Sequence, residues 1–419
     1  MIIDIIYGKI EKVNEIKRLK KKLRVNALKN GLRRGDRIVM LMVEKRKFNR
    51  IYYVLNVIRE NPDSSKSEIK KLSGLSMEVV LNYIDYLTQN GLIYQSGKRG
   101  DGVGRKSEIY RINPDGGRFI GIKFTAHKVS GILMNFAGTT LYVYEKKYER
   151  FKVSSTDLIS SIFDCVDDII KNNSAKGICG ISVSSPGLVD AENGILERYC
   201  DLIGDEPVPI GKAIEEKYGI ETYVCGTVKT KTIAHYLKKK SENYGNFVFI
   251  LIGEGCSMAF IYNDKLFSGE HNYDGEIGYI PVRSEDGTAA NIASIIGNTA
   301  VIDALSARGK AVADIFDFVE LIDKKDVCAI ELLERITDVT AYALSAVMTI
   351  CVPRRIVLCG DYVHVNEYRK KLEEKAEKYC LAEVFNSVSF EYIKNEKSDN
   401  AYDAAQYCYF KKFYYSKRT

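Results

Sequence analysis

The chain has 419 residues, enough for two or three domains, and its 46% hydrophobic content can supply a large core. The net charge of +7 is unevenly spread, because residues 1–115 hold 25 Lys and Arg against 13 Asp and Glu, while the remainder holds 37 against 42. This asymmetry favours a basic front that meets a polyanion such as nucleic acid. No apolar run is long enough to span a membrane or to act as a signal peptide, so we expect a cytoplasmic protein without membrane contact. All ten Cys follow residue 160 without a C-x-x-C or C-x-C pair, which favours reduced core thiols over a disulfide or zinc framework.

Residues 1–48 are rich in Lys and Arg, and we expect a helical extension with its densest cluster at Lys17–Arg24. Three roles stay open for it: a solvated arm, a contact to DNA phosphates, and a dimer contact.

Residues 49–115 form one small module in the sequence. Apolar residues at helical spacing predict a helix at its start. Ser65 and Glu68 have the form of a capping box and begin a second, short helix, with Ile69 and Leu72 facing inward.

Gly74 predicts a turn, and Ser76 caps a third helix that ends at Gly91. Two strands then flank a Gly-rich, basic loop over 97–106. A helix, a helix-turn-helix and a hairpin follow one another in the order of a winged helix-turn-helix. The predicted buried side of the third helix carries Val80, Ile84 and Leu87.

A helix-turn-helix places its second helix in the major groove of DNA. Asn82 there can pair with adenine, and Ser76 can bond a phosphate at the helix N-terminus. Because residues 76–90 contain no Lys or Arg, the affinity must come from the wing and the basic extension. Use of the module for dimerisation or protein contact is the alternative. The predicted DNA contacts are Ser76, Met77, Asn82, Lys98, Arg99, Arg105 and Lys106.

Residues 116–419 alternate strands and helices, which predicts an α/β fold. We see no internal repeat of 20–50 residues. The predicted elements are strands over 119–124, 131–136 and 140–147, a helix over 158–172, a strand over 177–184, a helix over 210–218, strands over 222–224, 247–251 and 258–262, a helix over 327–350, a strand over 355–358 and a helix over 402–415.

Several of these stretches resemble the ROK family of sugar kinases and repressors. Gly121–Gly138 has the apolar rhythm of the opening hairpin of that family, whose strand turns on D-I-G-G-T to cradle ATP phosphates. The other matching stretches are 100–115, 182–190 (S-V-S-S-P-G-L-V-D), 275–279 (G-E-I-G-Y), 353–360 (P-R-R-I-V-L-C-G) and 400–405.

The resemblance implies an N-terminal winged helix-turn-helix followed by a two-lobed actin-like (ribonuclease-H-like) ATPase-fold domain. The domains it implies are a basic extension over 1–48, a DNA-binding module over 49–115 and a body over 116–419, with lobe I at about 116–230 plus 396–419 and lobe II at about 231–395.

The residues that would carry kinase chemistry differ from the family pattern. Lys123 stands at the Asp of D-I-G-G-T, and Thr125 and Ala126 stand at its glycines, which a phosphate loop needs for close backbone approach. Thr227 stands at the Asp that serves as general base, and it cannot accept a proton as a carboxylate would. Glu254 adds negative charge to the second phosphate loop. We therefore expect no catalytic residue and no cofactor.

The structural zinc of the family is held by a His after G-E-I-G and by a Cys cluster. Tyr279 stands at that His, and residues 281–296 contain neither Cys nor His. A zinc site there would lack its ligands, so we predict no bound metal.

The effector pocket that the resemblance implies keeps Glu276, which matches a family residue that contacts sugar hydroxyls. Tyr279 would stack on a ring or fill the space. Asp361 and His364, after a predicted strand, mark a second place where a site could lie. The candidate effector residues are Glu276, Asn272, His271, Tyr279 and Thr227.

The leading hypothesis is a transcriptional regulator, a repressor that binds a double-stranded DNA operator as a homodimer or homotetramer and senses a small polar or sugar-like effector. One alternative is an active sugar kinase with a displaced base. The other is a DNA-binding or scaffold protein whose body binds no ligand.

Overall fold

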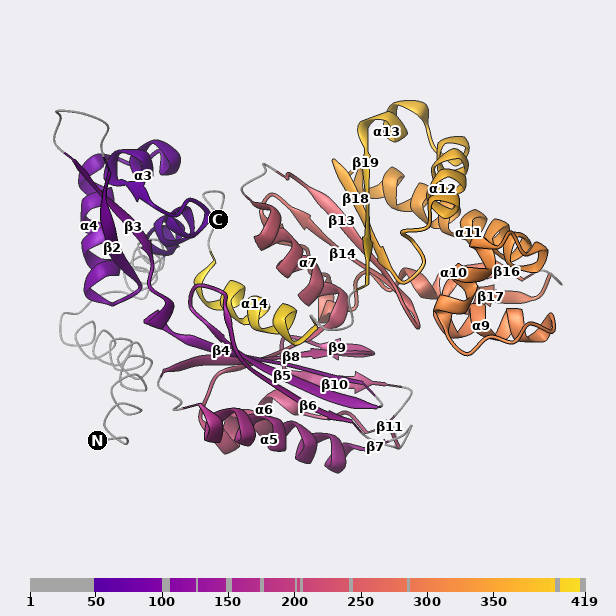
Figure 1. Cartoon of the computed structure of the whole chain (residues 1–419), viewed down its shortest axis with the longest axis horizontal. Helices are drawn as coiled ribbons and strands as arrows, with labels where there is room; N and C mark the ends of the chain where they lie inside the picture. Colours follow the sequence, from indigo (N-terminus) through magenta and orange to yellow (C-terminus); the bar gives the residue numbers. More distant parts are fainter. Residues whose placement is uncertain are drawn as a thin grey trace, which may run out of the picture. The chain divides into compact units, whose positions relative to one another are not determined.

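The chain, a computed structural model, forms two compact units (Figure 1), of which the first combines residues 1–187, 193–225 and 401–419 and the second combines 188–192 and 226–400. The structure describes residues 49–99, 106–125, 127–147, 153–173, 177–199, 202–203, 206–240, 244–284, 287–395 and 400–414. The predicted extension over 1–48 lies outside these residues.

None of the described helices is long and apolar enough to cross a membrane.

The first unit opens with a small helical module. A helix over 49–60 is followed by two helices and a three-stranded sheet in the order β1-β3-β2. The elements are β1 Ser64–Ser65, α3 Lys66–Ser73, α4 Met77–Gln89, β2 Ile93–Arg99 and β3 Ser107–Ile112.

Side-chain caps fix the ends of α3 and α4. Ser65 and Glu68 form both hydrogen bonds of a capping box, and Gly74 ends α3 in the left-handed region at φ 67°. Ser76 then caps α4 by accepting from the Val79 amide. The predicted caps, the turn and the buried face of α4 are confirmed.

Two expectations for this module are wrong. Leu72 is 48% exposed, because Ser73, one turn after Ile69, takes the inward position on α3. Strand β2 extends through Lys98 and Arg99, which were expected in the loop. Lys98 faces Glu108 across the ladder, and opposite charges at facing positions stabilise a strand pair.

The first unit is built on a five-stranded sheet in the order β12-β8-β4-β5-β6, in which β4, β5 and β6 form the predicted meander and β8 runs parallel to β4. The strands are β4 Arg118–Thr125, β5 Lys128–Asn135, β6 Thr140–Lys147, β8 Ile178–Ser185 and β12 Thr222–Gly226, with helices α5 Ser155–Asn172, α6 Ile210–Tyr218 and α14 Asn400–Phe413.

Two glycines let helices approach this sheet from opposite sides. Gly121 faces Ile132 and Gly131 faces Ile122 in the β4–β5 register, so the glycines lie on opposite faces. A Cβ at Gly121 would lie 2.0 Å from the Ala401 carbonyl oxygen of α14. A Cβ at Gly131 would lie 2.2 Å from the sulfur of Cys165 in α5. Figure 1 shows α14 and α5 on the two faces.

An aromatic cluster joins α14 to the first sheet. Phe119 and Phe136 pack edge-on against Tyr409 and Phe413, with ring centroids 5.0–5.9 Å apart. Edge-to-face pairs add to the free energy that burial of their area provides. The Tyr-rich end of the chain is thus a helix packed in the first unit, as its sequence predicts.

The second unit repeats the strand order of the first. Its sheet runs β15-β14-β13-β18-β19, so that in both sheets a three-stranded meander is followed by two further strands beside its first strand. The strands are β13 Phe247–Ile252, β14 Cys256–Tyr262, β15 Lys265–Leu266, β18 Arg355–Gly360 and β19 Ser389–Lys394. The helices are α7 Thr227–Lys239, α8 Ala293–Ile296, α9 Asn298–Ala307, α10 Ile315–Asp323, α11 Val327–Cys351, α12 Asn366–Tyr379 and α13 Ala382–Ser387.

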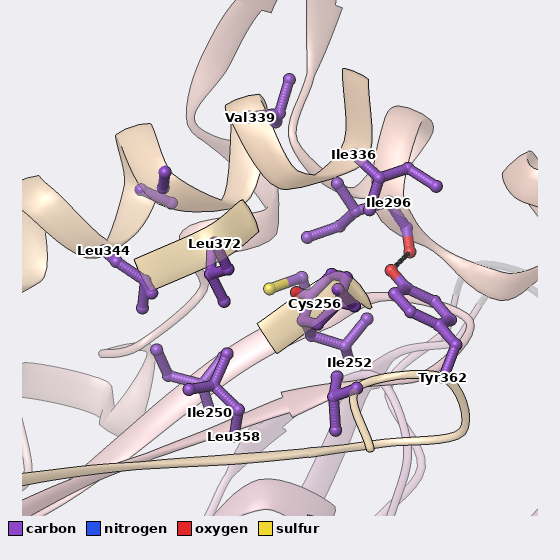
Figure 2. Close-up of a cluster of buried hydrophobic side chains, with 14 of the residues drawn as sticks. Ile250, Ile252, Cys256, Ile296, Ile336, Val339, Leu344, Leu358, Tyr362 and Leu372 are labelled. Atoms are coloured by element: carbon purple, nitrogen blue, oxygen red, sulfur yellow. Dashed lines mark hydrogen bonds between the residues drawn. The ribbon is translucent and has the colours of Figure 1, made fainter. Parts of the chain in front are cut away.

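The core of the second unit lies between its sheet and the long helix α11 (Figure 2). Ile250 and Leu358 come from neighbouring parallel strands and pack with Leu344 of α11. The buried Tyr362 satisfies its hydroxyl by donating to the Ile296 carbonyl at 2.5 Å. Strands β13, β14 and β18 and helix α11 confirm their predictions, whereas α7, α9, α10 and α12 were not predicted.

His235 of α7 lies in a half-buried polar network on the other face of this sheet, where it contacts Phe247 and Phe249. Its Nε2 is 2.7 Å from the hydroxyl of Tyr244, which donates to Glu391 of β19. Since that hydroxyl has given its hydrogen to Glu391, the His235 Nε2 must donate to it. Desolvation is the main cause that lowers the pKa of His235 from 6.5 to about 4, while Glu391 opposes this shift.

A pH titration of stability tests this environment. The unfolded state binds a proton on His235 near pH 6.5 and the folded state only near pH 4, so folding stability should fall as the pH drops between these values. His235→Gln should remove about 2 kcal/mol of this loss between about pH 7.5 and pH 5, measured by urea unfolding. His127→Gln, at an exposed position, is the control, and equal slopes in the two variants would contradict the assignment.

Candidate functional site

The outer face of α4 is the first candidate surface. Met77 and Asn82 are exposed, while Val80, Ile84 and Leu87 of the same helix are buried. Ser76 is exposed and holds the N-terminus of the helix with its hydroxyl. The structure therefore leaves all three residues of this segment that were predicted to contact DNA exposed.

The basic residues of the hairpin lie beside this helix pair in the same module. Lys98 and Lys106 are exposed, whereas Arg99 forms an ion pair with Glu68 that ties the end of β2 to α3. Arg105 lies outside the described residues. Arg99 is thus engaged within the module, and Lys98 and Lys106 are its more accessible cations.

Sequence reasoning missed two further cations. Lys70 and Lys71 are exposed in the last turn of α3, directly before the turn at Gly74. The sequence could have indicated them, because the two Lys directly precede the predicted turn of the helix-turn-helix. In that motif the first helix crosses the DNA backbone.

The loop that carries Glu276 is the second candidate site, and it lies in the second unit. Gly275 has φ 93°, and a Cβ there would lie 1.9 Å from the Met258 carbonyl oxygen. The Met258 amide donates to the Gly275 carbonyl at 2.7 Å, so the loop is fixed to β14. Only glycine allows this approach, and it sets the direction in which Glu276 leaves the loop.

Glu276 is exposed, but other protein atoms crowd its carboxylate. Desolvation raises the pKa of Glu276, and Asp274 raises it further, while Lys229 lowers it. An exposed carboxylate with a raised pKa is a candidate binding residue.

Lys229 of α7 is the residue here that sequence reasoning missed. Its side chain is 5% exposed and donates to the Asn272 carbonyl and the Asp274 carboxylate, both at 2.9 Å. Asp274 also accepts from the Gly269 amide at 2.8 Å. One buried ammonium group therefore links the start of α7 to both sides of the loop before Glu276. The local sequence of Lys229, T-V-K-T-K-T, does not predict its burial, because that burial depends on the distant loop that carries Asn272 and Asp274.

The other predicted effector residues are placed as follows. Thr227 is the first residue of α7, two positions before Lys229. Asn272 bonds Ser268 with its side chain and Lys229 with its carbonyl. Tyr279 is 73% exposed, so it fills no internal space. His271 lies in a 3-10 turn, and its side chain lies outside the described residues.

Two acidic groups of the second unit are engaged by internal hydrogen bonds. Glu254 accepts from the Thr299 hydroxyl beside the N-terminus of α9. Asp361, 1% exposed, accepts from the Asn298 amide at 2.8 Å. Negative charge and internal hydrogen bonds at these positions disfavour a bound phosphate.

The residues at the position of the family zinc site do not fit a zinc ion. Tyr279 offers a phenol in place of an imidazole, and the next segment forms a small hairpin of β16 Pro281–Arg283 and β17 Ala289–Asn291. That hairpin is held by its own ladder and contains no thiol. Across the described parts of the chain, no three His, Cys, Asp or Glu side chains lie close enough to hold a metal ion.

Comparison with known proteins identifies the family of the chain. The profile described as the ROK family matches residues 119–404. The xylose repressor of Caldicellulosiruptor bescii is 25% identical over 237 residues, which make up 56% of this chain and 58% of the repressor. The chain thus spans less than three fifths of the length of that relative.

Two solved structures show the fold. A ROK family transcriptional regulator, a homologue of the Escherichia coli MLC protein, has a TM-score of 0.73 at 17% identity and covers 86% of this chain and 96% of its own. The ROK hexokinase from Thermus thermophilus has a TM-score of 0.57 at 14% identity and covers 70% of this chain and 98% of its own. The body of the chain therefore has the actin-like ATPase fold, as predicted.

Substitution of Lys229 tests the link between α7 and the Glu276 loop. Lys229→Met leaves Asp274 half-buried without its cation and should lower the free energy of unfolding by about 3 kcal/mol. Hydrogen exchange of residues 268–276 should accelerate in the same variant. Lys324→Met, in an exposed helix pair with Glu320, should cost about 0.5 kcal/mol or less.

The double variant Lys229→Met, Asp274→Asn separates the pair from the rest of the loop. It should cost less than the sum of the two single variants, because neither partner is left buried and alone. Strict additivity would show that the two groups do not interact.

Elemental analysis of tag-free protein tests the zinc prediction. We expect far less than one zinc per chain and no change in melting temperature with a chelator, since the ligand types are missing. Stoichiometric zinc would contradict this prediction.

Proposed function

The chain belongs to the ROK family, and from this premise we propose that it is a DNA-binding transcriptional repressor whose kinase-like body senses an effector instead of phosphorylating it. In this proposal residues 49–115 are a winged helix-turn-helix and residues 116–419 are the sensor body. The repressor name of the relative and the basic charge of the front of the chain support this division.

The order of elements in the N-terminal module supports the DNA-binding assignment. The helix over 49–60, α3 and α4 are followed by the β2–β3 hairpin, which is the order of a winged helix. In this role α4 enters the major groove with Asn82 on its accessible face, and the hairpin presents Lys98 and Lys106 to phosphates. The solved regulator covers more of this chain than the hexokinase does, which fits an added module in front of the body.

The attachment of this module to α14 is the observation that carries the proposal. Asn56, 3% exposed, accepts from the Tyr409 hydroxyl at 2.8 Å and donates to the Phe413 carbonyl at 2.9 Å. Arg59 stacks over the Tyr409 ring at 3.7 Å and donates to Gln406 at 3.1 Å. These contacts couple the module to α14, and in this proposal they transmit a change in the body to the DNA-binding surface.

The side chains of the body argue against phosphoryl transfer. A kinase needs a carboxylate to accept the proton of the sugar hydroxyl, and Thr227 stands there. Lys123, Thr125 and Ala126 stand where the family pattern has Asp and Gly, and Glu254 adds negative charge to the second phosphate loop. We therefore assign no catalytic residue.

The effector in this proposal is a small polar or sugar-like molecule that binds beside Glu276. A repressor with two half-sites acts as a homodimer or homotetramer, and the effector changes the spacing of its two DNA modules. It can do so only by binding one spacing more tightly than the other.

Footprinting on DNA upstream of the protein's own gene tests the function. We expect protection of a palindromic site and weak binding to unrelated duplexes of equal length. Binding without any sequence preference would contradict the proposal, as would formation of a phosphorylated sugar from ATP by the pure protein.

The salt dependence of binding tests the wing. Arg105→Ala combined with Lys106→Ala should weaken operator binding and reduce the slope of log K against log salt concentration by about 2, because two phosphate contacts are lost. Lys370→Ala with Lys378→Ala, two exposed positions of α12, changes the net charge equally and should leave the slope unchanged. Equal slopes in both double variants would show that the wing does not contact DNA phosphates.

A further inference from the structure

A groove in the second unit is lined by arginine and tyrosine side chains that have no role in the proposed function. It has a volume of about 550 Å³ and is bordered by α11, the β16–β17 hairpin and the end of α12. Pockets for small molecules commonly measure about 300–1,000 Å³. The polar residues that line it are Arg283, Arg335, Asp338, Tyr342 and Tyr379.

Two guanidinium groups give the groove a positive character. Arg335 donates to the Arg283 carbonyl, and Arg283 donates to the Gly287 carbonyl at 3.0 Å. These carbonyl groups orient the guanidinium planes but do not neutralise them. Within the described residues neither Arg forms an ion pair, while Glu285 and Asp286 of the hairpin lie outside those residues.

Arg335 has a donor that lacks an acceptor. Its Nε is buried and has no hydrogen-bond partner within the described part of the chain. A buried donor without an acceptor costs about 1–3 kcal/mol, so Arg335 gains free energy when an acceptor in the groove pairs with its Nε. The Nε and terminal nitrogens of an Arg form a fork that matches the two oxygens of a phosphate or carboxylate.

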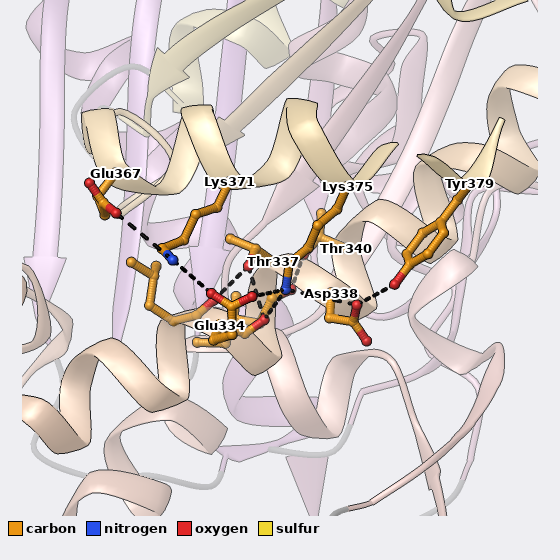
Figure 3. Close-up of polar contacts among 10 residues, drawn as sticks. Glu334, Thr337, Asp338, Thr340, Glu367, Lys371, Lys375 and Tyr379 are labelled. Atoms are coloured by element: carbon orange, nitrogen blue, oxygen red, sulfur yellow. Dashed lines mark hydrogen bonds and ion pairs between the residues drawn. The ribbon is translucent and has the colours of Figure 1, made fainter. Parts of the chain in front are cut away.

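The one described acid in the groove is already compensated (Figure 3). Asp338 accepts from the Tyr379 hydroxyl at 2.5 Å and lies 3.8 Å from Lys375. Glu334 holds Lys371 and Lys375 at 2.7 and 2.6 Å, so ion pairs join α11 to α12 next to Asp338. Asp338 therefore positions Tyr379 and does not neutralise Arg283 or Arg335, whose positive charge stays available to a ligand.

Two tyrosine rings border the groove and face solvent. Tyr342 is 57% exposed and Tyr379 is 46% exposed. Tyr342 lies two helical turns after Arg335, so both project from the same side of α11. Exposed aromatic rings beside guanidinium groups suit a ligand that has a ring body and a charged group.

We propose that this groove binds a small organic anion, a phosphate or carboxylate carried on a ring, with Arg335 as its anchor and Tyr342 against its ring. The site differs from the Glu276 loop in its residues and in its charge, and it does not depend on the repressor assignment.

Thermal shift and calorimetry on the full chain, without DNA, test the proposal. The probes are glucose 6-phosphate, AMP and benzoate, each compared with its neutral counterpart glucose, adenosine or benzamide at equal ionic strength. At least one anion should raise the melting temperature while its neutral counterpart does not. The phosphate and carboxylate probes separate the two sources of the oxyanion.

Variants assign the binding to the groove. Arg335→Gln should weaken binding of the anion at least about tenfold, because the charge-assisted hydrogen bonds are lost. Tyr342→Ala removes an exposed ring without disturbing the core, so it keeps the test valid if Arg335→Gln unfolds the protein, and it should also weaken binding. Lys370→Gln, an exposed cation of α12, should change nothing. The proposal is overturned if no anion binds, or if binding survives intact in both groove variants.

Discussion

The hydrogen bond between Tyr409 and Asn56 joins residues 353 positions apart and connects the N-terminal module to the C-terminal helix. Around it, Phe119 and Phe136 pack on the same face of α14, and Gly121 removes the Cβ that would push the helix away. The position of the module therefore depends on a helix that belongs to the body. A regulator requires such a connection, because a module on a free linker would not respond to changes in the body.

Internal contacts engage most polar groups of the candidate sites in the second unit. Lys229 is bonded to Asn272 and Asp274, and Glu254 and Asp361 accept from nearby side chains. Buried polar groups of this kind are costly when unpaired, and each of these groups has a partner within the chain. Glu276 is the exception, since it stays accessible with a raised pKa.

Much of the fold could be predicted because its signals are local. The capping box at Ser65, the left-handed Gly74 and the apolar runs of the strands each identify an element without reference to the rest of the chain. The prediction that Leu72 faces inward was wrong, because helical spacing alone does not say which of two adjacent positions faces the core.

The candidate sites depend on residues that are far apart in sequence, and they were harder to predict. The burial of Lys229 is set by a loop 43 to 45 positions later, and the groove at Arg335 combines two helices and a hairpin. Helix α7 was missed because its polar sequence has buried Lys and Thr residues instead of an apolar stripe. The strand order shared by the two sheets likewise has no repeat in the sequence, because many side chains satisfy one backbone pattern.

The position of α14 in the chain has a consequence for synthesis. Residues 49–112 leave the ribosome early, but the helix that anchors them is made only after the whole second unit, since 226–400 are inserted before it. A nascent or prematurely terminated product would carry this module without the helix that holds it. Packing of the module onto α14 therefore has to wait until residues 400–413 have been synthesised.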